Sequence, residues 1–277
     1  MRLFSATDLN VVLHAERLFN LGGIIITNSM LLGWLVSVLM VGLFVLAAKR
    51  IRITSGGNVM SLFELIAESI TNLAADVMHD RKKAIKYAPF LITLFCFILF
   101  NNWAGLLPGV GSIKYHHEPL FRAWTSDLTG TLALSITSIV LIQIYTIREL
   151  KIGGYLKHYF SNQPWNPINL LIGFIEVLGE FTRIASLALR LFGNVFAGEV
   201  LLLVMAAITS LASPAATLPF IFLEIFVGLI QAFVFTMLVI VYLALATTQH
   251  EEELTEVSDH PVQTNAVPAV LGSSSKG

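Results

Sequence analysis

Arg190 places a positive charge in the middle of a long apolar segment that runs from Asn169 to Met205. A guanidinium at the centre of a bilayer costs about 2.5–3.5 kcal/mol on insertion scales. It cannot avoid this cost by losing its proton, because a guanidinium stays charged in proteins. Arg190 must therefore face protein or water and have an anionic partner. It is either half of a structural ion pair with another helix or a fixed charge beside an ion path.

Other polar side chains share the face of this segment that carries Arg190. On a helix with about 100° per residue they fall within about 80° of one another. They are Glu176, Glu180, Arg183 and Asn194. Intramembrane carboxylates are costly unless they line a hydrated cavity, so the stripe predicts a water-filled path. The alternatives are that the two glutamates are solvated near the helix start, and that Arg183 pairs with one of them at helical spacing.

The last apolar segment has a polar face of its own. This face comprises Glu224, Gln231 and Tyr242. Glu199, in the preceding segment, lies about 140° from Glu176, so we expect it to approach a different neighbour. Because Glu199 and Glu224 lie deep in apolar sequence, we predict that they relay protons and do not only pack.

The composition excludes several other classes of function. Of the 277 residues, 56% are hydrophobic and 13% are charged, against roughly 25% charged in soluble domains. A net charge of −1 gives no bulk attraction to nucleic acid. We find no phosphate-binding glycine loop, nucleophile triad or metal-ligand spacing, and the adjacent His116 and His117 point in different directions on most backbones. We therefore expect no catalytic residue, metal or cofactor, and no covalent chemistry in this chain itself.

Five segments are long and apolar enough to cross a bilayer core about 30 Å thick. They are residues 23–48, 88–107, 128–147, 168–210 and 218–247. They predict an all-α polytopic membrane protein with a single membrane domain, residues 1–249. We interpret the first span as a retained anchor and not a signal peptide, because Lys49-Arg50-Ile51-Arg52 follows it directly. The polar residues 250–277 are expected to be a disordered tail.

Residues 59–79 form a different kind of predicted helix. Apolar residues recur at helical spacing on one side, and Ser61, Glu64, Glu68 and Asn72 lie on the other. This pattern predicts an amphipathic helix in the plane of the membrane interface. Its acidic face is either solvated or a docking surface for a partner subunit.

The distribution of lysine and arginine predicts the orientation. With the N-terminus outside, the inner segments 49–88, 148–168 and the tail hold seven, three and one basic residues. The outer segments hold four in all: Arg2, Arg17, Lys114 and Arg122. The positive-inside rule therefore predicts that the N-terminus is outside and the C-terminus is cytoplasmic.

Residues 186–199, Ser-Leu-Ala-Leu-Arg-Leu-Phe-Gly-Asn-Val-Phe-Ala-Gly-Glu, resemble the signature of subunit a of the bacterial F-type ATP synthase. Three further segments resemble the same family in the same order along the chain. They are Asn102–Gly109, Asp127–Leu134 and Gln231–Phe235, the last leading to Val241-Tyr242-Leu243. The resemblance covers residues 20 to 249.

The resemblance implies a stator subunit beside a rotating ring of c subunits, with its last two long helices tilted along that ring. Two offset aqueous half-channels would carry protons to and from the ring carboxylates, and Arg190 would be the essential arginine between them. Asn194, Glu199, Glu224 and Gln231 would belong to the outer half-channel, and Glu176 to the inner one. Candidate supporting residues are Asn102, Asp127, Glu180, Arg183 and Tyr242. The implied partners are the c ring, the b subunits of the peripheral stalk, the lipid bilayer and, indirectly, the catalytic head.

One position departs from the family pattern. Some bacterial members carry a histidine where this chain has Glu224, facing a position that matches Glu199. Two nearby carboxylates repel each other when both are ionised, so we expect the pair to share a proton and the relay to differ. The alternative functions are an independent channel or secondary transporter, in which Arg190 binds an anionic substrate, and a membrane scaffold. We find no internal repeat of the kind that many transporters carry. The coupling ion, H⁺ or Na⁺, stays open.

Overall fold

The computed structural model describes residues 17–21, 24–51, 58–107, 110, 114–115, 118–119, 122–160, 167–209 and 213–259. Within this part of the chain, six α-helices dominate the fold. They are α1 (Asn28–Ile51), α2 (Asn58–Met78), α3 (Arg81–Gly105), α4 (Leu128–Phe160), α5 (Pro167–Thr209) and α6 (Ser213–Asp259). The all-α polytopic architecture expected from the sequence is confirmed, since five of these helices are long and apolar enough to cross a membrane.

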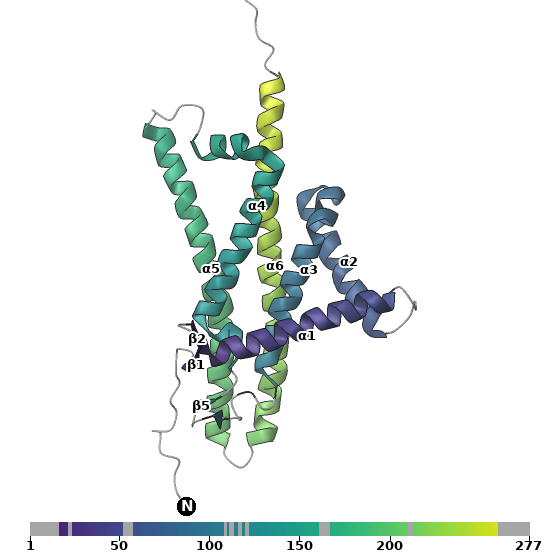
Figure 1. Cartoon of the computed structure of the whole chain (residues 1–277), viewed down its shortest axis with the longest axis vertical. Helices are drawn as coiled ribbons and strands as arrows, with labels where there is room; N and C mark the ends of the chain where they lie inside the picture. Colours follow the sequence, from purple (N-terminus) through teal and green to yellow (C-terminus); the bar gives the residue numbers. More distant parts are fainter. Residues whose placement is uncertain are drawn as a thin grey trace, which may run out of the picture.

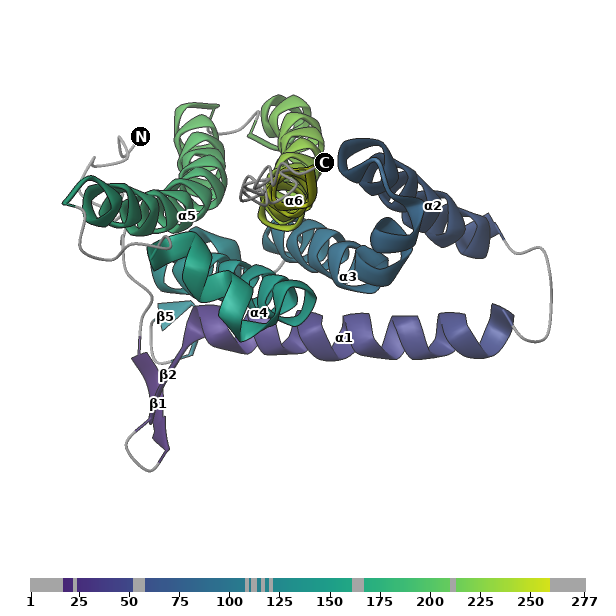
Figure 2. The ribbon, with the colours of Figure 1, turned by 90° about the horizontal axis from the view of Figure 1, so that it is seen from above.

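The four helices α3 to α6 run roughly side by side, and α1 lies across them (Figure 1). Seen from above, α3 and α4 form a middle layer, with α1 on one side of it and α5 and α6 on the other (Figure 2). α2 packs against α3 and α6. One side of the α5–α6 pair is therefore left uncovered by the other helices.

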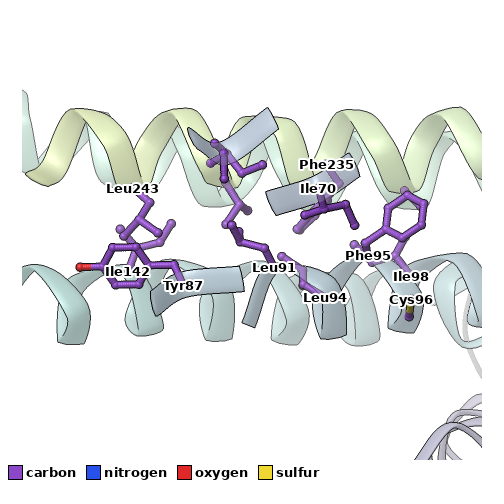
Figure 3. Packing of buried hydrophobic residues seen from close by; sticks show 14 of the residues in the cluster. Ile70, Tyr87, Leu91, Leu94, Phe95, Cys96, Ile98, Ile142, Phe235 and Leu243 are labelled. Atoms are coloured by element: carbon purple, nitrogen blue, oxygen red, sulfur yellow. The ribbon is translucent and has the colours of Figure 1, made fainter. Parts of the chain in front are cut away.

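The buried core lies where α2, α3, α4 and α6 meet. Figure 3 shows Tyr87, Leu91 and Ile98 of α3 in one cluster with Ile142 of α4 and with Phe235 and Leu243 of α6. Leu187 and Leu191 of α5 join the same cluster. By contrast, α1 leaves many large apolar side chains exposed, among them Val38 and Leu39. Exposed apolar area of this extent is typical of a surface that contacts lipid or another protein.

A sharp turn between α2 and α3 allows the two helices to pack against each other. His79 has a φ of 52°, in the left-handed region that ends many helices. Asp80 then starts α3, because its side chain accepts hydrogen bonds from the backbone N–H groups of Lys82 and Lys83. This is the normal way to satisfy free donors at a helix start. The amphipathic helix is thus tied directly to a membrane span.

The start of the first span differs from the prediction. Residues Ile24–Thr27 form strand β2, which pairs antiparallel with β1 (Arg17–Leu21), and the helix begins only at Asn28. Four β-branched residues in a row favour a strand over a helix. The Thr27 hydroxyl also accepts a hydrogen bond from the backbone N–H of Met30, so it caps the new helix. A second, smaller pairing joins β4 (Lys114–Tyr115) and β5 (Glu118–Pro119).

The last helix is longer than expected. α6 continues to Asp259, so the first ten residues of the expected disordered tail are helical. The sequence has no glycine or proline there until Pro261, and it contains four glutamates and a leucine, which are good helix formers. Residues 260–277, the remainder of that tail, lie outside the described residues.

Candidate functional site

A hollow of about 190 Å³ lies between α5 and α6 and reaches the end of α3. Most of its wall is apolar, and three polar side chains enter it: Asn102 of α3, Asn194 of α5 and Glu224 of α6. Such a volume holds several water molecules. A hollow with a carboxylate and two amides can carry a proton along hydrogen-bonded water.

Two glycines allow the helices around this hollow to approach closely. A Cβ atom on Gly198 would lie only 2.1 Å from Oε1 of Glu224, so the Glu224 carboxylate occupies the space that a side chain at position 198 would fill. A Cβ atom on Gly228 would lie 3.3 Å from Cβ of Asn102. Small residues at both contacts bring backbones together, as they commonly do between membrane helices.

Two hydrogen bonds join α3 to α6 beside the hollow. Nδ2 of Asn102 donates to the carbonyl oxygen of Gly228 at 3.2 Å, and Nε1 of Trp103 donates to the carbonyl oxygen of Ile225 at 3.1 Å. Oδ1 of the buried Asn102 has no hydrogen-bond partner among the described residues. A buried acceptor of this kind is usually satisfied by water.

Glu199 lies next to Gly198 but points toward a different element. Its Oε2 lies 4.0 Å from Nη2 of Arg122, and its carboxylate is also within hydrogen-bonding reach of Ser126. Both residues belong to the turn before α4, which contains the short 3-10 helix η2 (Trp124–Ser126). Glu224 is close enough to Glu199 for the two charges to interact. The two carboxylates therefore form a pair with unequal surroundings.

Arg190 occupies an exposed position on α5. Within the described part of the chain, its Nη2 donates a hydrogen bond to the Ser186 hydroxyl, at 3.4 Å and one helical turn away. Among the described residues no carboxylate forms an ion pair with Arg190. The intrachain ion pair that was one interpretation of this residue is thus not formed in the described part of the chain.

A second polar cluster lies farther toward the start of α5. Nη1 of Arg183 contacts Oε1 of Glu180 at 2.8 Å, and the guanidinium lies over the ring of Tyr242, 5.0 Å from its centroid. Arg183 therefore pairs with Glu180, one helical turn away, which is one of the two pairings that the helical spacing allows. Glu176 is one turn earlier in α5, and its side chain lies outside the described residues.

Two further candidate residues lie apart from both clusters. Gln231 is buried in α6, and its Nε2 has no hydrogen-bond partner among the described residues. Asp127 caps α4 by accepting from the backbone N–H of Thr129 at 3.0 Å, and it accepts from the Ser29 hydroxyl of α1 at 2.8 Å. These contacts make Asp127 a structural residue that ties α4 to α1.

No pattern in the sequence predicts that Arg122 and Ser126 lie next to Glu199. Both residues lie in an irregular segment without a period, so no helical wheel relates them to α5. His116 and His117 lie outside the described residues, and the described residues contain no group of three or more His, Cys, Asp or Glu side chains that could hold a metal ion.

Comparison with known proteins covers most of the chain. The family model described as ATP synthase A chain matches residues 30–244. The ATP synthase subunit a of Moorella thermoacetica is 32% identical over 228 residues, which are 82% of this chain and 94% of that protein. The ATP synthase subunit a of Vibrio parahaemolyticus is 33% identical over 244 residues, 84% of this chain and 85% of that protein. The similarity therefore spans both polar clusters and the segment around Arg190.

Proposed function

Because the chain belongs to the ATP synthase A chain family, that of subunit a of F-type ATP synthases, we propose that it passes protons to and from a ring of c subunits. It is a multi-pass membrane protein that takes part in proton transport. In the proposed mechanism, two offset half-channels meet the ring at Arg190, and the flow of protons turns the ring. A proton that moves down 100 mV supplies about 2.3 kcal/mol for this work.

The exposure of Arg190, and the lack of an ion pair to it among the described residues, support this proposal most directly. A fixed cation inside a membrane needs an anionic partner, and no described residue of this chain provides one as an ion pair. The partner would then come from another chain. A carboxylate on each c subunit fits this requirement, since it would be neutral in lipid and would give up its proton when it faces Arg190.

The positions of the two polar clusters fit two separate half-channels. The hollow with Asn102, Asn194 and Glu224 lies toward the end where α5 finishes and α6 begins. The cluster of Arg183, Glu180 and Tyr242 lies toward the opposite end. Arg190 falls between them along α5. We assign the first cluster to the outer half-channel, with Glu199 and Gln231, and the second to the inner half-channel, with Glu176.

The lengths of the last two helices fit an arrangement along a ring. The apolar parts of α5 and α6, Gly173–Met205 and Thr217–Thr247, have 33 and 31 residues. At about 1.5 Å per residue these are roughly 45–50 Å long, so a hydrocarbon core of about 30 Å requires a tilt of roughly 50°.

We further propose that the N-terminus lies outside and the C-terminus in the cytoplasm, in the inner membrane. The basic residues Arg81, Lys82, Lys83 and Lys86 open α3, at the end opposite to the α5–α6 hollow, so this end would be cytoplasmic. The b subunits of the peripheral stalk are then the expected neighbours on the stator side, and the catalytic head is an indirect partner.

The decisive experiment replaces Arg190 with alanine in the intact complex. We expect Arg190→Ala to abolish ATP-driven acidification of inverted membrane vesicles while the complex still assembles, because the ring carboxylates would lose their fixed counter-charge. Arg148→Ala, which removes an exposed arginine from α4, is the matched control and should pump normally. Near-normal pumping by Arg190→Ala would refute the proposal.

A further inference from the structure

The turn before α4 carries the charged side chain of Arg122 next to the proposed proton path. Without this side chain, the carboxylates of Glu199 and Glu224 would face each other. The side chain of Arg122 is only 14% exposed, and its Nη2 lies 4.0 Å from Oε2 of Glu199. Its Nε donates to the Ser126 hydroxyl at 3.2 Å, and that hydroxyl donates to the carbonyl oxygen of Ala123 at 2.9 Å. The guanidinium is therefore held by the turn and directed at α5.

The turn itself is fixed firmly within the bundle. Trp124 fills the space beside two glycines, since a Cβ atom on Gly33 of α1 or on Gly130 of α4 would lie within 2.9 Å of it. Its ring also packs edge-on against Phe97 of α3, with ring centroids 5.2 Å apart. Three helices thus fix the segment that carries Arg122. A charge on such a segment is pre-oriented and loses little freedom when it pairs.

The surroundings of the two carboxylates differ in kind. Glu224 lines the hollow and lies against Gly198, and its one charged neighbour among the described residues is Glu199. Glu199 is not part of the wall of the hollow, and it faces Arg122 and Ser126 on the side of the turn. A buried cation requires an anion beside it, so Arg122 and an ionised Glu199 satisfy each other. Glu224 has no such counter-ion.

We infer that Arg122 is a positioning residue, which holds Glu199 as a fixed anion and leaves Glu224 as the carboxyl group that exchanges a proton. This inference rests on the proposed function and assigns separate roles to Glu199 and Glu224 within the proposed outer half-channel. A proton from the outer water neutralises the Glu224 carboxylate, and the same proton later leaves Glu224 for the partner carboxylate opposite Arg190. Glu199 keeps its charge throughout, so the pair does not compete for one proton.

The test is the pH dependence of passive proton flux through the membrane sector, with the catalytic head removed. Removal of the cation in Arg122→Gln leaves two acids facing each other, which favours their protonated forms. The pH of half-maximal flux should then rise by roughly half to one unit. Arg122→Lys keeps the charge and should restore the original profile.

Two further variants separate positioning from a general loss of structure. Glu199→Gln removes the carboxylate beside Arg122, so the guanidinium acts on Glu224 alone of the two acids and should shift the half-maximal pH downward. The double variant Arg122→Gln/Glu199→Gln should return the half-maximal pH toward the original value. Glu224→Gln should remove the pH dependence of the flux. Lys86→Gln breaks an ion pair with Glu149 at the other end of the bundle and is the matched control, with no expected shift.

Several outcomes would overturn the inference. An unchanged pH profile in Arg122→Gln would overturn it. A loss of pH dependence in Glu199→Gln, with the dependence retained in Glu224→Gln, would also overturn it, because the two glutamates would then have the opposite roles. If Arg122→Gln does not assemble, the profiles of Glu199→Gln and Glu224→Gln still decide between the carboxylates. These results are independent of the pumping test on Arg190→Ala, whose failure would refute the proposed function itself.

Discussion

Glu199 and Glu224 lie on neighbouring helices, but each contacts a different part of the protein. Glu224 enters the hollow between α5 and α6, and Glu199 faces the turn that carries Arg122 and Ser126. A hydrated path needs side chains that can exchange hydrogen bonds with water, whereas a packing position needs only volume. A hydrated path and a packing position therefore predict different changes in proton flux when the glutamates are replaced by glutamine or by leucine.

Replacement of both acids by leucine should slow passive proton flux far more than replacement of either one by glutamine. Leucine has a similar volume but cannot hydrogen-bond water, so the path would become dry; glutamine keeps a polar, hydrated lining. Flux is measured in head-depleted vesicles. The double change Glu64→Leu/Glu68→Leu on the exposed face of α2 is the control. Normal conduction by the Glu199→Leu/Glu224→Leu variant would mean that these residues only pack.

Gly198→Ala tests how closely the Glu224 carboxylate must approach α5. The new methyl group would lie 2.1–2.9 Å from the carboxyl atoms of Glu224, so the carboxylate must move away from Asn194 and the hollow. We expect assembly to persist and proton flux to fall several-fold, because the side chain is flexible enough to shift but leaves its position. Gly42→Ala on α1, where a Cβ atom meets nothing within 4 Å, should leave flux unchanged.

At the scale of elements, α2 shows how an amphipathic helix is shared between the protein and its surroundings. Ser61, Glu64, Glu68 and Asn72 are all exposed, as the pattern predicts. The opposite side is only partly covered: Ile70 and Ala74 are buried in the core, and Leu62 is 55% exposed. Part of the apolar face therefore packs within the bundle, and exposed side chains such as Leu62 can contact lipid.

Cysteine labelling can test the orientation of this helix. Single cysteines at positions 64, 68 and 72, in a Cys96→Ala background, should react with a membrane-impermeant thiol reagent in inside-out vesicles and be protected in right-side-out cells. Cysteines at the buried positions 70 and 74 should react much more slowly in both. The background change is mild, because Cys96 is itself buried. Labelling of the exposed positions only from outside would reverse the proposed orientation.

At the scale of the whole molecule, the side of α5 that carries Arg190 is not covered by the rest of the described chain. Gly193 and Ala197 are exposed on this helix, next to Arg190, and a Cβ atom on Gly193 meets nothing within 4 Å. Small side chains beside a charge allow another helix to approach closely. Among the described residues, no neighbour requires a glycine at position 193.

Gly193→Leu therefore distinguishes a surface that contacts lipid from one that contacts the ring. The larger side chain should fit without any clash inside the subunit, so insertion and expression should be unchanged. If the c ring docks here, the variant should lose most of its coupled pumping and co-purify poorly with the ring. Gly42→Leu on α1 is the control, with the same change in an equally open place. Normal pumping by Gly193→Leu would place the ring contact elsewhere.

Local sequence alone is enough to predict the membrane helices and to show that Arg190 places a charge inside an apolar segment. The number of apolar spans follows from their length and composition, which depend on local residues alone. Helical periodicity also predicted the pairing of Arg183 with Glu180, since both lie on one helix. The family resemblance added the role of the segment around Arg190, which periodicity cannot supply.

Which polar groups meet depends on how the helices pack against one another. Asn102 of α3 joins Asn194 and Glu224 at one hollow, Asp127 caps α4, and Arg122 reaches Glu199 from an irregular turn. Each of these contacts joins residues from different elements or depends on the path of a loop. They are fixed by how helices rotate against one another and where the glycines at positions 198 and 228 let them approach. A periodic pattern contains only the geometry of its own helix, so it cannot predict contacts that depend on the placement of a second one.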